Sequence, residues 1–192
     1  LKKVKYSCSS PTRLFLQLGT LDMAKKFYDL PARVVTFGSD STSVDIQAGI
    51  ESYENEVGAI LGGMDWTLSE IGTLEGMLTV SFEKTIIDEE IAERLLFLRK
   101  GIDVSDEALS KDLINAVGAN TYLKEKDTRN HYKDEWYPTV TDWDSNSSSR
   151  DCSDYEYVVS RANRIWKERI AAAPETMLDP ELDKELTSYM DK

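Results

Sequence analysis

Apolar residues along the first half of the chain alternate between two spacings. Residues 33–37 form a short β-branched and aromatic run, as expected of a buried strand. Apolar positions then recur every three or four residues, which predicts a helix over 44–61. A second apolar run at 64–68 predicts a second strand. Strand, helix and strand in this order predict a βαβ unit with a parallel strand pair. The helix is expected to bury one apolar face, made of Ile46, Ile50, Tyr53, Val57 and Ile60.

Helical spacing also covers most of the remaining chain. A Ser-Asp-Glu start at Ser105 predicts a capped helix that buries Leu109 and Leu113. Residues 77–82 fit either a third short strand or the entry to a helix. Residues 144–149 are of low complexity and predict an exposed loop. The expected helices span 11–30, 82–100, 106–117, 128–136, 155–172 and 180–190.

This pattern divides the chain at residue 118. Residues 1–118 alternate strands and helices, whereas residues 119–192 are expected to be mostly helical and to pack on the first part as an extension. Leu1 stands where a complete chain has Met, which suggests a piece of a longer protein.

Composition narrows the class of protein. Of the 192 residues 41% are hydrophobic and 30% charged, as in a globular protein with a core of its own. A net charge of −12 argues against nucleic acid as a partner, because phosphate binding needs a basic surface. No run approaches 18 apolar residues and no signal-peptide core is visible, so we expect no membrane partner. Two cysteines, Cys8 and Cys152, are too few for a disulfide framework and suggest the reducing cytoplasm.

The sequence lacks several common motifs for nucleotide binding and metal-dependent catalysis. It contains no GxxxxGK[ST], no GxGxxG after a strand and no HExxH. His131 is the single histidine, so a histidine metal site or a Ser-His-Asp triad cannot be built from this chain, and we predict no metal site. The aromatic residues between 122 and 143 favour packing of an irregular segment, with a cage for a quaternary ammonium as the other interpretation.

Polar residues follow each expected strand and form the candidate site. Loops at the carboxyl ends of parallel strands are where α/β folds bind ligands, and a carboxylate there can take a proton or hold a cation. The simpler alternative is that Asp40, Ser41 and Ser43 cap the helix at 44–61 and that Glu75 stabilises a turn. The candidates are Ser39, Asp40 and Ser41 after the first strand, and Ser69, Glu70 and Glu75 after the second.

At these residues the sequence resembles the trimethylamine methyltransferase family. The resemblance rests on spaced blocks in a consistent order, which cover most of the chain and are more specific than any single motif. The blocks are Gly38-Ser39-Asp40-Ser41, Asp45-Ile46-Gln47-Ala48-Gly49 with Glu51, Gly72-Thr73-Leu74-Glu75-Gly76, Leu78-Thr79-Val80-Ser81-Phe82-Glu83-Lys84, Ile87-Asp88-Glu89-Glu90-Ile91, Lys100-Gly101-Ile102, Ala162-Asn163 and Leu178-Asp179-Pro180.

The resemblance carries expectations about fold and function. It implies the C-terminal part of a (β/α)8 TIM-type barrel, followed by a helical C-terminal extension. It further implies transfer of a methyl group from a tertiary or quaternary amine, such as glycine betaine or trimethylamine, to the cobalt of a corrinoid protein. That partner protein would carry the corrinoid, so the chain itself is expected to bind no cofactor directly. A homo-oligomer is also compatible with a partial barrel.

The resemblance also suggests roles for the candidate residues. Asp40 and Glu75 are the expected catalytic residues, since carboxylates can stabilise the cationic nitrogen while the methyl group is oriented. Substrate-binding roles are expected for Ser39, Ser41, Gln47, Ser69 and Glu70. Two other interpretations stay open: a truncated, non-catalytic relative that acts as a binding or interaction module, and an unrelated α/β barrel enzyme such as a lyase.

Overall fold

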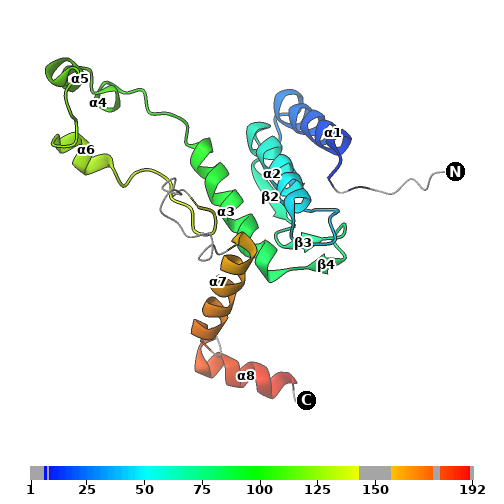
Figure 1. Cartoon of the computed structure of the whole chain (residues 1–192). Coiled ribbons are helices and arrows are strands. Elements are labelled where there is room, and N and C mark those ends of the chain that lie inside the picture. The colour runs from blue at the N-terminus through cyan, green and yellow to red at the C-terminus, as the bar shows by residue number, and fades with distance from the viewer. Residues whose placement is uncertain (1–6, 8, 143–156, 175–177, 191–192) are drawn as a thin grey trace.

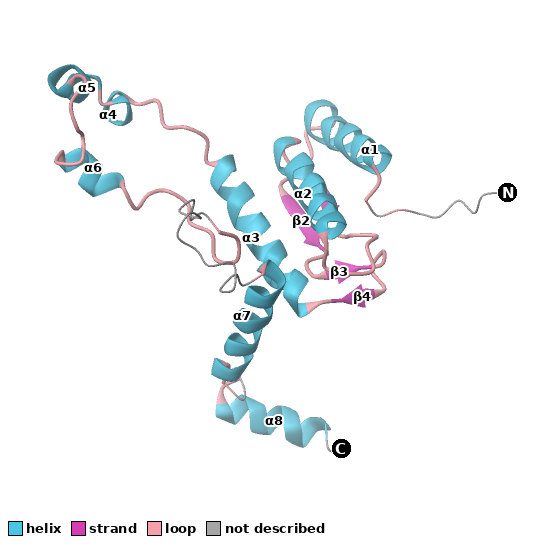
Figure 2. Ribbon diagram, viewed as in Figure 1, coloured by secondary structure: helices cyan, strands magenta, loops and turns pink. Residues whose placement is uncertain are grey.

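The computed structural model describes residues 7, 9–142, 157–174 and 178–190. Cys8, Cys152 and the expected loop at 144–149 lie outside these residues. The chain has mixed α/β structure, rich in helix (Figure 2). Its first half runs through α1 (Pro11–Asp22), the π-helix η1 (Met23–Phe27), β1 (Arg33–Thr36), α2 (Ile46–Leu61) and β2 (Trp66–Ser69).

The expected βαβ unit is confirmed. Strands β1 and β2 pair in parallel, with Arg33 opposite Trp66 and Thr36 opposite Ser69. Helix α2 connects them, and Gly63 follows it with a φ of +80°, a conformation that favours glycine. In the described part of the chain each sheet has two strands, so the structure does not show the expected barrel. A small core of Leu21, Ala32, Val34 and Ala59 joins α1, β1 and α2.

Helix α2 buries a different face from the one expected. Ile46 is 82% exposed and Ile50 is 59% exposed, so the apolar face points largely away from the sheet. Ile60 is buried as expected, but the other buried residues of α2 are small or polar: Ala48, Ser52, Asn55, Glu56 and Ala59. Small residues let α2 approach the sheet closely, and the polar ones bond to the chain after β1. Ser52 Oγ donates to the Phe37 carbonyl at 3.1 Å and Asn55 Nδ2 to the Gly38 carbonyl at 3.2 Å.

The ambiguous run at 77–82 contains both a strand and a helix start. β3 (Thr73–Leu74) and β4 (Thr79–Val80) pair antiparallel as a short hairpin. Helix α3 (Phe82–Arg99) follows at once, and the Ser81 side chain caps it by accepting from the Lys84 amide. Gly101, with a φ of +72°, ends this helix region as expected.

Residues 102–142 leave the end of α3 and return alongside it (Figure 1). This excursion contains α4 (Asp106–Leu109), α5 (Lys111–Val117) and α6 (Lys126–His131). Ser105 caps α4 as expected, but Ser110 at a φ of +46° breaks the single helix that the sequence predicts into two. The expected buried stripe is also wrong, because no residue of α4 or α5 is buried.

Helix α7 (Val158–Ala172) packs along α3, and α8 (Pro180–Met190) follows it (Figure 1). Ile86, Val140 and Ala162 form the core between them. The Glu83 carboxylate accepts from Asn163 Nδ2 at 2.6 Å and Trp166 Nε1 at 3.0 Å, both on α7. The hydrogen bond from Asn163, ahead of that from Trp166, lowers the pKa of Glu83 to about 2. Glu83 therefore stays charged over the whole physiological range and links the two helices.

Glu90 on α3 holds the returning end of the excursion. Its carboxylate is 3% exposed and accepts from the backbone amides of three consecutive residues, Thr139, Val140 and Thr141. The Thr139 contact is 2.9 Å and the Thr141 contact 3.1 Å. Burial acts to raise the pKa of Glu90, but these donors and the Thr141 hydroxyl outweigh it, and the pKa lies below its ordinary value.

Candidate functional site

The loops after β1 and β2 meet at the carboxyl end of the parallel pair. The Glu75 amide donates to the Ser41 carbonyl and the Gly76 amide to the Ser39 carbonyl, both at 2.9 Å. The loop after β2 thus lies against the loop after β1 through backbone hydrogen bonds. The structure brings together two groups of candidate residues that stand about thirty positions apart in the sequence.

Glu51 of α2 organises the first loop. Its Oε2 accepts from Ser39 Oγ at 2.7 Å and from the Asp40 amide at 2.9 Å, while its Oε1 accepts from Gln47 Nε2 at 2.9 Å. One carboxylate therefore connects three candidate residues. Ser39 is fully buried, Asp40 is half-buried and Gln47 is exposed, so the network runs from the interior to the surface.

The cap of α2 is Asp45 rather than Asp40. Asp45 accepts from the Ala48 amide at 3.0 Å, and this hydrogen bond lowers its pKa. Ser41 and Ser43 both donate to the Asp45 carboxylate, at 3.0 and 3.2 Å. The capping interpretation thus holds indirectly for the two serines. The Asp40 carboxylate accepts from Ser7 Oγ instead.

Glu75 and Ser69 lie at the surface of the site. Glu75 has a φ of +52° and its exposed side chain accepts from Thr79 Oγ1 at 2.6 Å, across the β3–β4 hairpin. This contact matches the alternative in which Glu75 stabilises a turn. Ser69 ends β2 opposite Thr36 and has an exposed side chain. Both are within the loop region but outside the network around Glu51.

Glu70 is the buried acid of the second loop. Its side chain is 9% exposed, its amide donates to the Thr36 carbonyl at 2.9 Å, and its Oε2 is buried without a hydrogen-bond partner among the described residues. Burial raises the pKa of Glu70, and the charges of Arg13 and Lys84 oppose the rise. A buried acidic oxygen without a donor is costly and often marks a ligand position.

Beneath the loops lies a buried ionic cluster that sequence reasoning did not select. Lys84 and Asp88 of α3 are each 1% exposed and form an ion pair at 2.5 Å. Glu56 of α2 is 3% exposed, and burial raises its pKa. Both Lys84 and Asp88 stand inside the motif blocks. The available signal was their spacing of four, which puts two opposite charges on one face of the helix, close to Ile87 and Ile91.

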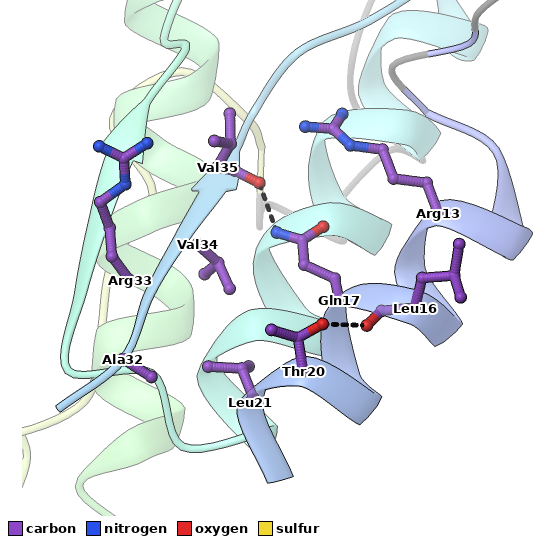
Figure 3. Close-up of a pocket in the computed structure, with 9 residues that line it drawn as sticks. All are labelled: Arg13, Leu16, Gln17, Thr20, Leu21, Ala32, Arg33, Val34 and Val35. Atoms are coloured by element: carbon purple, nitrogen blue, oxygen red, sulfur yellow. Dashed lines mark hydrogen bonds between the residues drawn. The ribbon is translucent and has the colours of Figure 1, made fainter. Parts of the chain in front are cut away.

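Two hollows border the sheet and α2. The first, about 320 Å³, lies between α1 and the edge of β1 that β2 leaves open (Figure 3). Gln17 reaches across it from α1, and its Nε2 donates to the Val35 carbonyl at 2.8 Å. The second, about 350 Å³, lies between α2, α3 and the start of α7. None of the candidate residues lines either hollow, so the candidate site is the loop network itself.

The described residues hold no group of three or more His, Cys, Asp or Glu side chains placed to bind a metal ion. His131 is exposed and its Nδ1 lies 2.7 Å from Asp134. That hydrogen bond raises the pKa of His131. No helix among the described residues is long and apolar enough to cross a membrane.

Fold and site together define a β/α protein that presents acidic and hydroxyl side chains at the carboxyl end of a parallel strand pair, the usual place for small ligands. The profile of the trimethylamine methyltransferase (MTTB) family matches residues 7–192. The chain belongs to this family, which confirms the resemblance found in its motif blocks.

Named relatives are methyltransferases. The chain is 34% identical over 169 residues to a glycine betaine methyltransferase from Desulfitobacterium hafniense, covering 86% of this chain and 34% of the relative. It is 29% identical over 174 residues to a proline betaine:corrinoid methyltransferase from Eubacterium limosum (89% and 36%). It is 35% identical over 130 residues to the trimethylamine methyltransferase MttB from Methanosarcina barkeri (67% and 26%). The chain therefore spans about a third of the length of the first two relatives.

Proposed function

We propose that this chain forms the C-terminal part of a (β/α)8 barrel, with its helical extension, in a methyltransferase that moves a methyl group from a tertiary or quaternary amine to the cobalt of a corrinoid protein. Glycine betaine and trimethylamine represent the substrate class. Family membership supports the reaction type, and the relatives' names support an amine donor and a corrinoid acceptor.

The observation that carries the proposal is the acidic loop network at the carboxyl end of β1 and β2. Asp40 and Glu51 lie in one loop network, and Glu70 and Glu75 lie in the loop that is bonded to it. A quaternary ammonium carries a positive charge that it cannot donate as a hydrogen bond, so carboxylates and aromatic faces are the groups that recognise it. Carboxylates in these loops therefore suit the cationic donor better than neutral side chains would.

The chemistry asks these residues to position the substrate rather than to form a bond. The C–N bond of the methyl group breaks, its electron pair stays on the departing amine, and the methyl carbon bonds to the partner's cobalt, which supplies the new pair. Asp40 and Glu75 hold the cationic nitrogen, while Ser39, Ser41, Gln47, Ser69 and Glu70 shape its surroundings. The positive charge on nitrogen disappears during transfer, so binding the cation too tightly would slow the reaction.

The parallel pair supports the barrel proposal. β1 has one neighbour among the described residues, and its other edge lies open along the hollow of Figure 3. An open strand edge has unpaired backbone groups that a further strand would satisfy. Within the described residues, a side chain, that of Gln17, bonds this edge at Val35 alone.

Substitution of Asp40 tests the amine site directly. In the full-length protein, Asp40→Asn is expected to weaken glycine betaine binding about 10-fold, because a carboxylate–cation contact in a partly buried site is worth about 1.5 kcal/mol. Glu75→Gln should have a smaller effect, since Glu75 is exposed. Isothermal titration of betaine and of its carbon analogue 3,3-dimethylbutanoate, which lacks the positive charge on the trimethyl group, measures both. Unchanged betaine affinity in Asp40→Asn, or equal losses for both ligands, would remove Asp40 from the cation site.

A further inference from the structure

The buried pair Lys84–Asp88 has contacts beyond its own ion pair. The Lys84 ammonium donates to the Phe37 carbonyl at 2.9 Å and to Ser52 Oγ at 2.8 Å. The Asp88 carboxylate accepts from the Gly72 amide at 2.8 Å. One partner therefore bonds the backbone of the loop after β1, and the other bonds the backbone of the loop after β2. Both loops are attached to the same two turns of α3.

The two backbone positions held by the pair are unusual. Phe37 has a φ of +69°, a conformation that a bulky residue adopts only when its surroundings enforce it. Its carbonyl accepts from both Lys84 and Ser52. Gly72 has a φ of +79°, and a Cβ there would meet Thr85 Oγ1 at 2.3 Å. The first loop turns sharply, and the second approaches α3 so closely that only glycine fits.

The anchored positions lie next to the candidate residues. Phe37 is followed directly by Gly38, Ser39 and Asp40, and Gly72 lies between Glu70 and Glu75. The charge of Lys84 also favours the ionised form of Glu70. Burial of an ion pair usually gives no stability advantage over apolar residues of similar size, so stability alone does not account for the pair.

We propose that Lys84 and Asp88 are positioning residues that hold the loops after β1 and β2 in register with each other, and so set the spacing of Asp40 and Glu70 around the substrate cation. This inference rests on the proposed function for the identity of the substrate, but the register of the loops is a property of the chain alone. Neither side chain contacts the amine. Both act through the backbone carbonyl of Phe37 and the amide of Gly72.

The test replaces the whole pair, Lys84→Met with Asp88→Leu, in the full-length protein. This double variant removes both charges of the ion pair together, so it should melt within a few degrees of the wild type. Hydrogen exchange is expected to rise at least about 10-fold in the two loops, residues 37–41 and 70–76. It should stay unchanged along α3. For methyl transfer, kcat should fall at least about 10-fold with a smaller change in KM, because misplaced loops misalign the donor.

Further variants sharpen the result. Asp88→Asn keeps an acceptor for both Lys84 and Gly72. It should therefore retain most of the loop protection that the double variant loses. Ser52→Ala removes one donor to Phe37 and leaves the ion pair, so exchange should rise at 37–41 but not at 70–76. Lys84→Met alone removes the other donor to Phe37 and serves if the double variant does not fold, because burial raises the pKa of Asp88 and favours its neutral form. Lys26→Met, which breaks the exposed Asp22–Lys26 pair, is the matched control and should change neither loop.

The outcomes separate the two proposals. Wild-type loop exchange in the double variant, or wild-type exchange at 37–41 in Lys84→Met if the double variant does not fold, would overturn the positioning role whatever the activity. A general rise in exchange along α3 would also overturn it, since the pair would then be structural. If wild-type protein transfers methyl groups from no amine, the proposed function fails, while increased exchange confined to the two loops still supports their attachment by this pair.

Discussion

Replacing Glu90 with alanine is expected to release residues 139–141 from α3 and to raise amide exchange there about 100-fold. The variant leaves three backbone amides without their acceptor, and the Val140 amide is buried. Loss of charge-assisted hydrogen bonds of this kind costs about 3 kcal/mol locally. Hydrogen exchange of the full-length protein, followed by mass spectrometry, measures the change peptide by peptide.

Glu93→Gln is the matched control, since Glu93 is exposed on the same helix. It should leave exchange at 139–141 unchanged. The pKa of Glu90 is depressed in the folded chain, so its stabilising contribution is complete above the ordinary glutamate pKa of 4.5 and is lost as pH falls through the lower folded value. Protection of 139–141 should therefore decline in acid. Equal exchange in Glu90→Ala and wild type would show that Glu90 does not hold residues 139–141 against α3.

Replacing Glu70 with glutamine is expected to weaken amine binding by about 10- to 100-fold without loss of stability. A charge pair in a partly buried site contributes about 1.5–3 kcal/mol, and glutamine keeps the shape while removing the charge. The pKa of Glu70 is raised, so the folded state disfavours its charged form and the residue lowers stability at neutral pH. The Gln variant should consequently melt at the wild-type temperature or above.

The raised pKa of Glu70 should also make amine affinity depend on pH. As pH falls through the raised pKa, Glu70 becomes neutral, and wild-type affinity for the cation should drop at a higher pH than for an ordinary glutamate. Glu70→Gln should lack this step, and Glu54→Gln, a change on α2, should keep it. Titrations with a quaternary amine from pH 4.5, the ordinary glutamate value, up to neutral pH and beyond follow this step. A destabilised Glu70→Gln with normal affinity would assign Glu70 a structural role instead.

The spacing of apolar residues predicted where strands and helices lie better than it predicted which of their faces are buried. The βαβ unit and the start of α3 are local properties, and spacing in the sequence was enough for both. The buried face of α2 was wrong because the rule that apolar residues face the core ignores two competing effects. Ala48 and Ala59 allow close packing, and Ser52 and Asn55 satisfy carbonyls of the turn after β1. Those carbonyls belong to a turn that the sequence does not specify on its own.

The candidate site likewise contains residues that the sequence could predict and residues that it could not. Asp40, Glu70 and Glu75 could be found because they follow strands, and strand ends are visible in the sequence. Lys84 and Asp88 could not be selected by this rule, because they lie on a helix and reach the loops only through backbone contacts made in the folded chain. Whether Asp40 and Glu75 act on a substrate stays a prediction. The geometry places them in adjoining loops, where Asp40 accepts a hydrogen bond from Ser7 and Glu75 accepts one from Thr79.

Methyl transfer by the full-length protein tests the central claim most directly. The measurement follows the cobalt spectrum of a reduced corrinoid protein during incubation with a panel of tertiary and quaternary amines. The account predicts methylation with at least one amine that carries an N-methyl group, and a loss of more than about 10-fold in the double variant Asp40→Ala with Glu75→Ala, since two charge contacts are removed. Methylation with no amine, or full activity in that variant, would contradict it.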